Sequence, residues 1–244
     1  MRMEHNCQAL NEAIISCRQC PRLVEWREFV ALHKVRRFQH ETYWGKPLTG
    51  FGDTKAELVI VGLAPAAHGG NRTGRMFTGD DSGNWLIDAL YQTGFANQNR
   101  SERADDGLIL TNAYVTAGVR CAPPQNKPTR EEKVNCFHFL EDEINLIKPR
   151  VIVVLGRFAY DSFRQYLGTL DIKAPLASNF GHGRRITWDT IQARQLTLLM
   201  SYHPSRQNTQ TKKLTRPMFL DIFEMARTIL KNREGLDKKS LYRQ

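Results

Sequence analysis

Residues 57–62 read ELVIVG, a short and almost continuous apolar run that ends in glycine. A strand that is buried on both faces of a parallel sheet has this pattern, whereas a half-exposed strand alternates apolar and polar residues. Residues 151–155 (VIVVL) and 196–201 (LTLLMS) have the same character. We therefore expect these three runs to form central strands of one sheet.

Further strands alternate with helices along the chain. Residues 108–113 (LILTNA) are expected to form another strand of the sheet, and residues 185–189 an edge strand. Thr129 and Glu132 have the spacing of a capping box at the start of a helix. This alternation predicts an open, mostly parallel sheet with helices on both faces. Helices are expected over residues 84–93, 129–147, 156–167 and 217–230.

The chain has 244 residues, enough for a single hydrophobic core. It contains no internal repeat, low-complexity tract or clear linker, so we expect one domain over residues 1–244. An N-terminal helix over about residues 5–21 should pack on this domain. The charged tail from about residue 232 to residue 244 should be frayed.

The charge balance points to a polyanionic partner. Lysine and arginine number 35 against 25 acidic residues, the net charge is +10 and the pI is about 9.6. Nucleic acid and an anionic membrane surface both fit this balance. The sequence has no apolar run of membrane-spanning length and no apolar signal segment near Met1. We therefore expect a cytoplasmic protein without a membrane partner.

Five cysteines in a cytoplasmic protein need an explanation other than disulfides. Cys17 and Cys20 form a C-x2-C pair, and Cys121 and Cys136 follow about a hundred residues later. Four thiolates can hold zinc or an iron–sulfur cluster, and the loose second pair favours the cluster. Four unconnected buried thiols remain the alternative, and Cys7 is expected to be a small core residue.

Ligand sites of open parallel sheets lie beyond the carboxyl ends of the strands. The first such loop, residues 62–80, reads GLAPAAHGGNRTGRMFTGD. It is neither a Walker A motif nor G-x-G-x-x-G, which weakens a nucleotide-phosphate enzyme as an interpretation. Arg72 and Arg75 could meet phosphates, Phe77 offers a stacking face, and Asp80 a carboxylate. The other loops carry Asn112 and residues 201–208 (SYHPSRQN).

These residues resemble the uracil-DNA glycosylases of the iron–sulfur branch, and most of all family 5 (type 5, the "b" type). The resemblance covers residues 17–211. It rests on residues 62–80, the strand expected to end near Asn112, residues 120–128 (RCAPPQNKP), four cysteines and residues 203–208 (HPSRQN). It implies a three-layer α/β/α sandwich with a central four-stranded, mostly parallel sheet. It also implies a monomeric, monofunctional DNA repair enzyme, nucleoid-associated in a prokaryote, that hydrolyses the N-glycosidic bond of uracil and leaves an abasic site.

The resemblance assigns roles to individual residues. Phe77 would stack on the flipped base, and Asn112 would read the edge of uracil. Gly62 and Ala64 would contact the base, with backbone N–H groups aimed at its O2. His203 would donate to the same oxygen, where negative charge develops as the bond breaks.

The remaining implied roles concern the DNA backbone and the metal. Ser205 and Arg206 would touch flanking phosphates, together with Arg72 and Arg75, and Gln207 would fill the gap left by the flipped base. A structural [4Fe-4S] cluster, with zinc as the alternative, would be held by Cys17, Cys20, Cys121 and Cys136.

One departure concerns the group that activates water. Most families of this superfamily carry a polar residue just after the first strand, whereas this chain has Leu63, Ala64, Ala66 and Ala67. Family 5 shares this feature, and its apolar pocket implies a wider range of deaminated bases, such as hypoxanthine. Asp80 is the leading candidate for activating water and His68 the second. Asp80 could instead only cap the following helix.

A non-catalytic, metal-stapled nucleic-acid-binding module is the alternative function. The basic charge and the cysteines fit it equally well. The loops with Asn112 and His203 do not, because a mere binder needs no base pocket.

Overall fold

The computed structural model describes residues 2–170, 179–189 and 195–241, and in this part of the chain six strands form one sheet in the order β1-β3-β2-β4-β6-β5. The four central strands are parallel, and the two edge strands, β1 and β5, are antiparallel to their neighbours. The expected four-stranded parallel sheet is therefore the centre of a larger mixed sheet. The strands are β1 (Phe51–Gly52), β2 (Leu58–Gly62), β3 (Ala113–Ala117), β4 (Val151–Leu155), β5 (Arg185–Asp189) and β6 (Gln195–Ser201).

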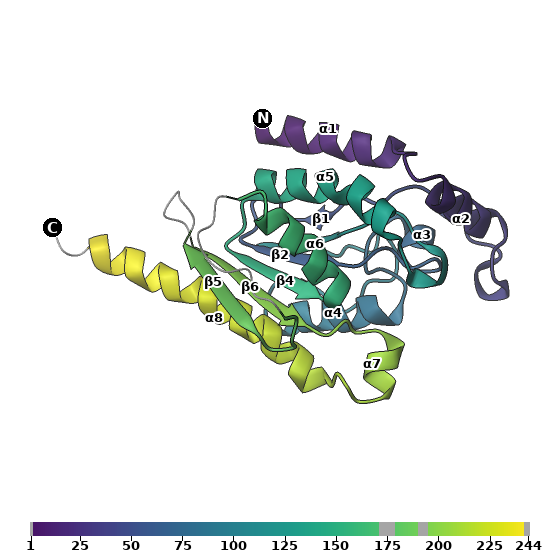
Figure 1. Cartoon of the computed structure of the whole chain (residues 1–244). Coiled ribbons are helices and arrows are strands. Elements are labelled where there is room, and N and C mark those ends of the chain that lie inside the picture. Colours follow the sequence, from purple (N-terminus) through teal and green to yellow (C-terminus); the bar gives the residue numbers. More distant parts are fainter. Residues whose placement is uncertain (1, 171–178, 190–194, 242–244) are drawn as a thin grey trace.

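Helices cover both faces of the sheet, which confirms the three-layer prediction (Figure 1). Every residue of β2, β3 and β4 is buried, as their apolar sequences predict. On one face lie α5 (Arg130–Ile147) and α6 (Arg157–Leu167), with α1 (Arg2–Ser16) packed on the outside of α5. The other face packs against α4 (Asp81–Gln92) and α8 (Arg216–Leu241).

The shorter helices lie outside this core. They are α2 (Pro21–Leu32), α3 (Gly70–Thr73) and α7 (Arg206–Gln210), with 3-10 turns η1 (Arg36–Phe38) and η2 (Pro124–Asn126). The capping box of α5 is present as predicted. Thr129 Oγ1 accepts from the Glu132 backbone N–H, and Glu132 Oε2 accepts from the Thr129 backbone N–H.

Three expectations about boundaries are wrong. Residues 108–112 are not a strand: Leu110 forms only an isolated bridge with Ala96, and β3 begins at Ala113. The single N-terminal helix expected over residues 5–21 is two helices, because α1 ends at Ser16 and α2 begins at Pro21. The last helix does not end at residue 230, since α8 continues to Leu241.

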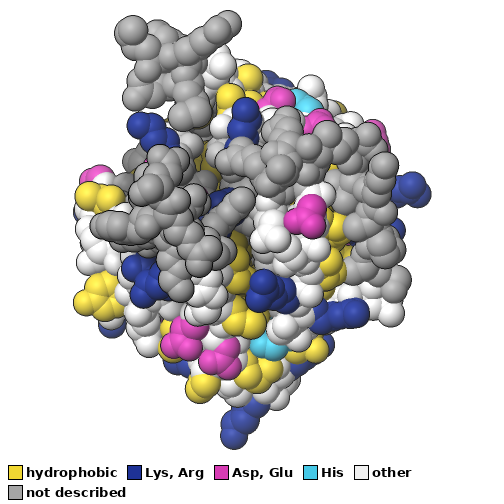
Figure 2. Space-filling model, turned by 90° about the vertical axis from the view of Figure 1, so that its left-hand side faces the viewer, with side chains coloured by type: hydrophobic (Ala, Val, Ile, Leu, Met, Phe, Trp, Pro, Cys, Tyr) yellow, Lys and Arg dark blue, Asp and Glu magenta, His cyan; other side chains and the backbone are white. Residues whose placement is uncertain are grey.

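The two ends of the sheet differ in what surrounds them. The parallel strands point toward the end of the molecule where α2, α3 and α7 lie (Figure 1). At the other end, side chains of both charges lie scattered among apolar ones on the described surface (Figure 2). No helix in the described residues is long and apolar enough to span a membrane.

Candidate active site and cysteine centre

Phe77 and His203 come together at the carboxyl edge of the sheet. Phe77 lies in the loop that follows β2, and His203 in the loop that follows β6. Their rings are stacked, with centroids 6.2 Å apart and planes 29° apart. The parallel arrangement of β2, β4 and β6 explains the meeting, because it brings both loops to one edge. An aromatic face and an imidazole thus lie next to each other at the carboxyl ends of the strands.

The backbone at Phe77 is unusual. Its φ is +50°, in the left-handed region that bulky side chains rarely adopt. The ring lies against Gly62, the last residue of β2, where an added Cβ would come within 2.7 Å of Phe77 Cε2. Glycine at position 62 is therefore what allows the ring to cover the end of the strand.

His203 is partly buried and its loop is braced from two sides. Asn208 Nδ2 donates to the His203 carbonyl at 2.8 Å, and Ser82 Oγ donates to the Pro204 carbonyl at 3.0 Å. Burial lowers the pKa of His203 to about 4. The imidazole is therefore neutral near pH 7 and keeps one N–H to donate.

A pocket of about 310 Å3 opens beside His203. The ends of β4 and β6 and the first turn of α6 form its floor and walls. Four of its ten lining residues carry rings, and two others, Arg157 and Lys213, are cations. The full lining is Leu63, Leu155, Gly156, Arg157, Phe158, Phe180, Tyr202, His203, Asn208 and Lys213. No role was predicted for Arg157 and Phe158, which begin α6 and are separated from the end of β4 by one residue.

Asp80 is the N-cap of α4. Its Oδ1 accepts from the Gly83 backbone N–H at 2.8 Å, and its Oδ2 lies against Gly69, where an added Cβ would collide with it. Burial raises the pKa of Asp80, an effect that the bond from Gly83 opposes. For the second candidate, His68, a 3.1 Å hydrogen bond joins its Nδ1 and the Tyr43 hydroxyl. The capping role of Asp80 is thus present, and its carboxylate also stands in the same loop as Phe77.

Three of the expected DNA-binding residues surround the start of α7, next to His203. Ser205 is its N-cap and accepts from the Asn208 backbone N–H. Arg206 and Gln207 are exposed. Arg206 Nε makes a 2.6 Å ion pair with Asp81, and 74% of the Arg206 side chain stays accessible. These residues are therefore placed at the surface beside the site.

The other two expected phosphate ligands, Arg72 and Arg75, are buried and engaged inside the protein. Arg72 pairs with Glu41 and donates to the His68 carbonyl. Arg75 pairs with Asp106 at 2.8 Å and also donates to Ser101 and Thr78. Their guanidinium groups brace the first loop, so the expectation that they bind phosphates is wrong.

Asn112 and Phe77 lie at opposite ends of the parallel strands, Asn112 at the amino ends and Phe77 at the carboxyl ends. It precedes β3, and its side chain bonds to Glu57 at the start of β2: Oδ1 accepts from the Glu57 backbone N–H at 2.7 Å, and Nδ2 donates to the Glu57 carboxylate. Five residues separate Glu57 from Gly62, so roughly 16 Å lies between the two places at about 3.3 Å per residue. Asn112 cannot read a base stacked on Phe77. The carboxyl end of β3 is Ala117, which pairs with Gly62.

The four predicted cysteine ligands line one small chamber of about 10 Å3. The chamber lies between the residues that connect α1 to α2, the loop that follows β3 and the side of α5. Three N–H groups point at sulfur: Arg27 Nη1 at Cys121 (2.9 Å), the Arg120 backbone at Cys136 (3.3 Å) and Asn135 Nδ2 at Cys20 (3.7 Å). In the described residues no group of three or more ligand side chains is arranged to hold a single metal ion.

Comparison with known proteins identifies the family of this chain. The sequence model of the uracil DNA glycosylase superfamily matches residues 49–227, nearly three quarters of the chain. The chain belongs to this superfamily. Within it, a Mycobacterium leprae (strain TN) protein named Type-5 uracil-DNA glycosylase is 46% identical over 225 residues, or 90% of this chain and 94% of that protein.

Other superfamily members also match over most of their length. A Type-5 uracil-DNA glycosylase of Thermus thermophilus is 45% identical over 91% of this chain and 97% of that protein. A Type-4 uracil-DNA glycosylase of Pyrobaculum aerophilum is 30% identical over 81% of this chain and 82% of that protein. The resemblance to the type-5 members of the uracil DNA glycosylase superfamily is therefore confirmed.

Proposed function

We propose that this protein is a DNA repair glycosylase that flips uracil out of DNA and hydrolyses its N-glycosidic bond, leaving an abasic site. The observation that carries the proposal is the Phe77–His203 pair at the carboxyl edge of the sheet. An aromatic face and a neutral hydrogen-bond donor in one loop cluster are what base extrusion and cleavage require. The names of the type-5 relatives support it.

The chemistry follows from where charge develops. As the N-glycosidic bond breaks, positive charge grows on the sugar and negative charge on the base. A neutral His203 can donate to the base O2, so its hydrogen bond strengthens in the transition state. Phe77 would hold the base by stacking. Water then adds to the sugar C1′ and completes the hydrolysis.

We propose that Asp80 positions this water. Its Oδ1 is fixed by the cap of α4, so the orientation of the carboxylate is set before substrate arrives. The preceding loop residues Leu63 and Ala64 offer no side-chain acceptor. Burial raises the pKa of Asp80, which favours a group that can take up a proton.

The base range is proposed to be wider than uracil and to include hypoxanthine. Ala117 at the end of β3 and Leu63 after β2 are both apolar. With Asn112 at the opposite edge, these positions provide no amide that tests the Watson–Crick edge of the base. Selection would then rest on shape, stacking and the ease of extrusion, which other deaminated bases also satisfy.

The DNA contacts are assigned to the loop of His203. Ser205 and Arg206 would meet phosphates beside the flipped nucleotide, and Gln207 would enter the gap in the duplex. Their exposure next to the site supports this assignment. Arg157 and Lys213, in the pocket beside His203, add positive charge along the same path.

We further propose that Cys17, Cys20, Cys121 and Cys136 hold a structural [4Fe-4S] cluster, with zinc as the alternative. The residues fit such a group, because four thiols from three parts of the chain face one chamber and N–H donors point at three of the sulfurs. The cluster would link the N-terminal helices to the loop after β3. It plays no part in the bond cleavage described above.

The nucleic acid partner is DNA that contains deaminated bases. A monomeric protein that works in the cytoplasm, at the nucleoid in a prokaryote, stays a prediction from the sequence.

Excision on defined DNA tests the proposed function. The folded, metal-loaded protein is incubated with duplexes that carry uracil, hypoxanthine or xanthine opposite different bases, and hot alkali then breaks abasic sites. Breaks at uracil are expected, with weaker cleavage at hypoxanthine. An absence of breaks beyond those of undamaged DNA would contradict the proposal and leave the non-catalytic binding module as the better interpretation.

A further inference from the structure

Residues 29–46 form an exposed surface that the catalytic chemistry does not use. Four of the seven large apolar side chains that are exposed in the described chain lie here. They include the Phe29 ring, which is 48% exposed, and the Trp44 ring, which is 37% exposed. We call residues 29–46 the aromatic–basic surface.

The same surface carries positive charge that no carboxylate neutralises. Arg36, Arg37 and Lys46 are exposed, and none of them forms an ion pair within the described residues. Two carboxylates in or next to this segment pair with other arginines, Glu28 with Arg18 and Glu41 with the buried Arg72.

Cations and rings alternate in contact with each other. The Arg37 guanidinium lies 4.9 Å from the centre of the Phe38 ring, and Lys46 Nζ lies 5.4 Å from that of Trp44. Phe29 stacks on His33 with ring centroids 4.2 Å apart. Flat rings beside cations suit single-stranded nucleic acid, whose bases stack while its phosphates meet the charges.

The aromatic–basic surface is fixed to the catalytic loop. The Trp44 backbone N–H donates to the Arg72 carbonyl at 3.0 Å, and the Gly45 N–H to the Asn71 carbonyl at 3.1 Å. The Arg72 guanidinium also stacks on Phe38 at 4.0 Å. The surface therefore has a set position relative to residues 62–80, which hold Phe77.

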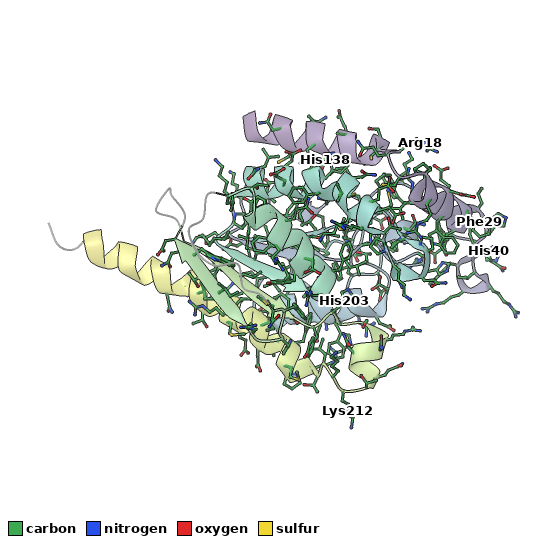
Figure 3. All side chains as sticks on the ribbon, viewed as in Figure 1. Arg18, Phe29, His40, His138, His203 and Lys212 are labelled. Atoms are coloured by element: carbon green, nitrogen blue, oxygen red, sulfur yellow. The ribbon has the colours of Figure 1, made fainter. Side chains whose placement is uncertain are left out.

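The position of the aromatic–basic surface suits contact with DNA that extends beyond the active site. Phe29 and His40 lie at the end toward which the parallel strands point, further out than His203 (Figure 3). On the other side of that end stands α7 with Arg206 (Figure 1). DNA bound across the carboxyl edge would have α7 on one side and the aromatic–basic surface on the other.

We propose that the aromatic–basic surface binds the DNA strand that continues beyond the flipped nucleotide, with Arg36, Arg37 and Lys46 on its phosphates and Phe29 and Trp44 against unpaired bases. This inference rests on the proposed function for its partner. It adds a second contact region, so affinity should depend on the length of DNA outside the lesion.

A charge-removal variant tests the proposal. Arg36→Gln, Arg37→Gln and Lys46→Gln are combined and compared with a matched control, Lys55→Gln, Lys148→Gln and Lys231→Gln. The control residues are exposed and lie toward the amino ends of the strands or late in α8. Binding is measured with undamaged single-stranded and duplex DNA of about 12 and about 40 nucleotides over a range of salt concentrations.

The surface variant should weaken binding of the long DNA more than that of the short DNA. The slope of log K against log salt should fall by about 2 to 3, because each lost phosphate contact removes roughly 0.7 to 0.9. A separate Phe29→Ala variant should weaken single-stranded binding more than duplex binding. Excision at saturating enzyme should stay within about twofold of the wild type, since the base contacts are unchanged.

Identical binding and slopes for the surface variant and its control would overturn the proposal. So would a finding that the surface variant loses only binding to a protein partner. These readouts use undamaged DNA, so they remain decisive whether or not the chain excises uracil. A wild-type protein that binds this DNA normally but excises no uracil would instead count against the proposed function.

Discussion

The Phe77 ring lies 6.2 Å from the His203 imidazole, and the two rings are within 29° of parallel. One residue precedes α4 and the other precedes α7, so their meeting depends on β2 and β6 lying on either side of β4. A base that stacks on Phe77 would have a hydrogen-bond donor within the same cluster of loops. This proximity is the reason that we propose the two loops as the base-cleaving site.

Replacement of His203 should reduce chemistry more than binding. His203→Ala is expected to lower the single-turnover excision rate about 10²- to 10³-fold, the range for losing one donor to a developing negative charge. Affinity for undamaged DNA should be unchanged, which serves as the control for folding. A rate close to that of the wild type would remove His203 from this role.

The pH dependence should lack a titration of His203 near its ordinary value. Burial lowers the pKa of His203 to about 4, so the donor stays neutral from about pH 5 upward. The excision rate should therefore not fall between pH 7.5 and about pH 5.5 on account of this group. NMR titration of the imidazole measures its pKa directly, and a value above about 6 would contradict the prediction.

The same residue affects stability in acid. Between the unfolded pKa near 6.5 and the folded pKa near 4, the unfolded state binds a proton that the folded state does not. The free energy of unfolding contributed by His203 should therefore decrease as the pH falls through this window. Urea unfolding at several pH values should show a smaller decrease in His203→Ala than in the wild type.

A substitution of Gly62 tests whether the position of the Phe77 ring matters, and it leaves Phe77 and His203 themselves unchanged. In Gly62→Ala the new methyl would lie 2.7 Å from the Phe77 ring, so the ring must move. A displacement of about 1 Å at a reacting site can cost about 100-fold in rate, and we expect a loss of that order. Circular dichroism should show an intact fold, and normal activity would mean that Phe77 does not need its present position.

Two substitutions of Asp80 can distinguish its helix-capping role from its proposed catalytic role. Asp80→Asn keeps a side-chain oxygen for the Gly83 N–H, so the helix should be retained, whereas Asp80→Ala should cost about 1 kcal/mol of stability. If Asp80 positions water, Asp80→Asn should still lower excision at least about 100-fold. A rate for Asp80→Asn within about twofold of the wild type would leave Asp80 with the cap alone.

Arg27 should influence the metal content. Its side chain is 2% exposed, its Nη1 donates to Cys121, and its Nε has no hydrogen-bond partner. A carboxylate oxygen of Glu28 lies 4.0 Å from Arg27 Nη2, and four metal-bound thiolates would add negative charge beside Arg27 Nη1 of this buried cation. Arg27→Gln should therefore lose iron and visible absorption faster in air than the wild type. A colourless wild-type protein that contains zinc would refute the choice of cluster.

Strand identity was predictable wherever the chain is buried on both sides of the sheet. The limits of β4 and β5 match the prediction, and β2 and β6 differ by one residue. Residues 108–112 misled because LILT has the same apolar character as a strand. Whether such a run pairs as a strand depends on partners that are distant in the sequence, and Leu110 forms only an isolated β-bridge, with Ala96. Because a strand was expected to end near Asn112, this residue was expected at the carboxyl ends of the strands. It lies instead at their amino ends, directly before β3.

The roles of the arginines show a second limit. Arg72 and Arg75 stand in a glycine-rich loop, which favoured an exposed, phosphate-binding interpretation. Their partners Glu41 and Asp106 are about thirty residues away in opposite directions along the chain, and only the fold brings them together. The motif alone therefore could not indicate that Arg72 and Arg75 are buried, which only the structure shows.

The left-handed backbone at Phe77 has a consequence for protein engineering. A phenylalanine at φ +50° holds conformational strain on the order of 1 kcal/mol that glycine would relieve. A search for stabilising substitutions would accordingly favour glycine or asparagine at this position and would remove the ring that stacks on His203. Heat tolerance and excision thus make opposing demands on one residue, and a thermostabilised variant should keep Phe77 and gain its stability elsewhere.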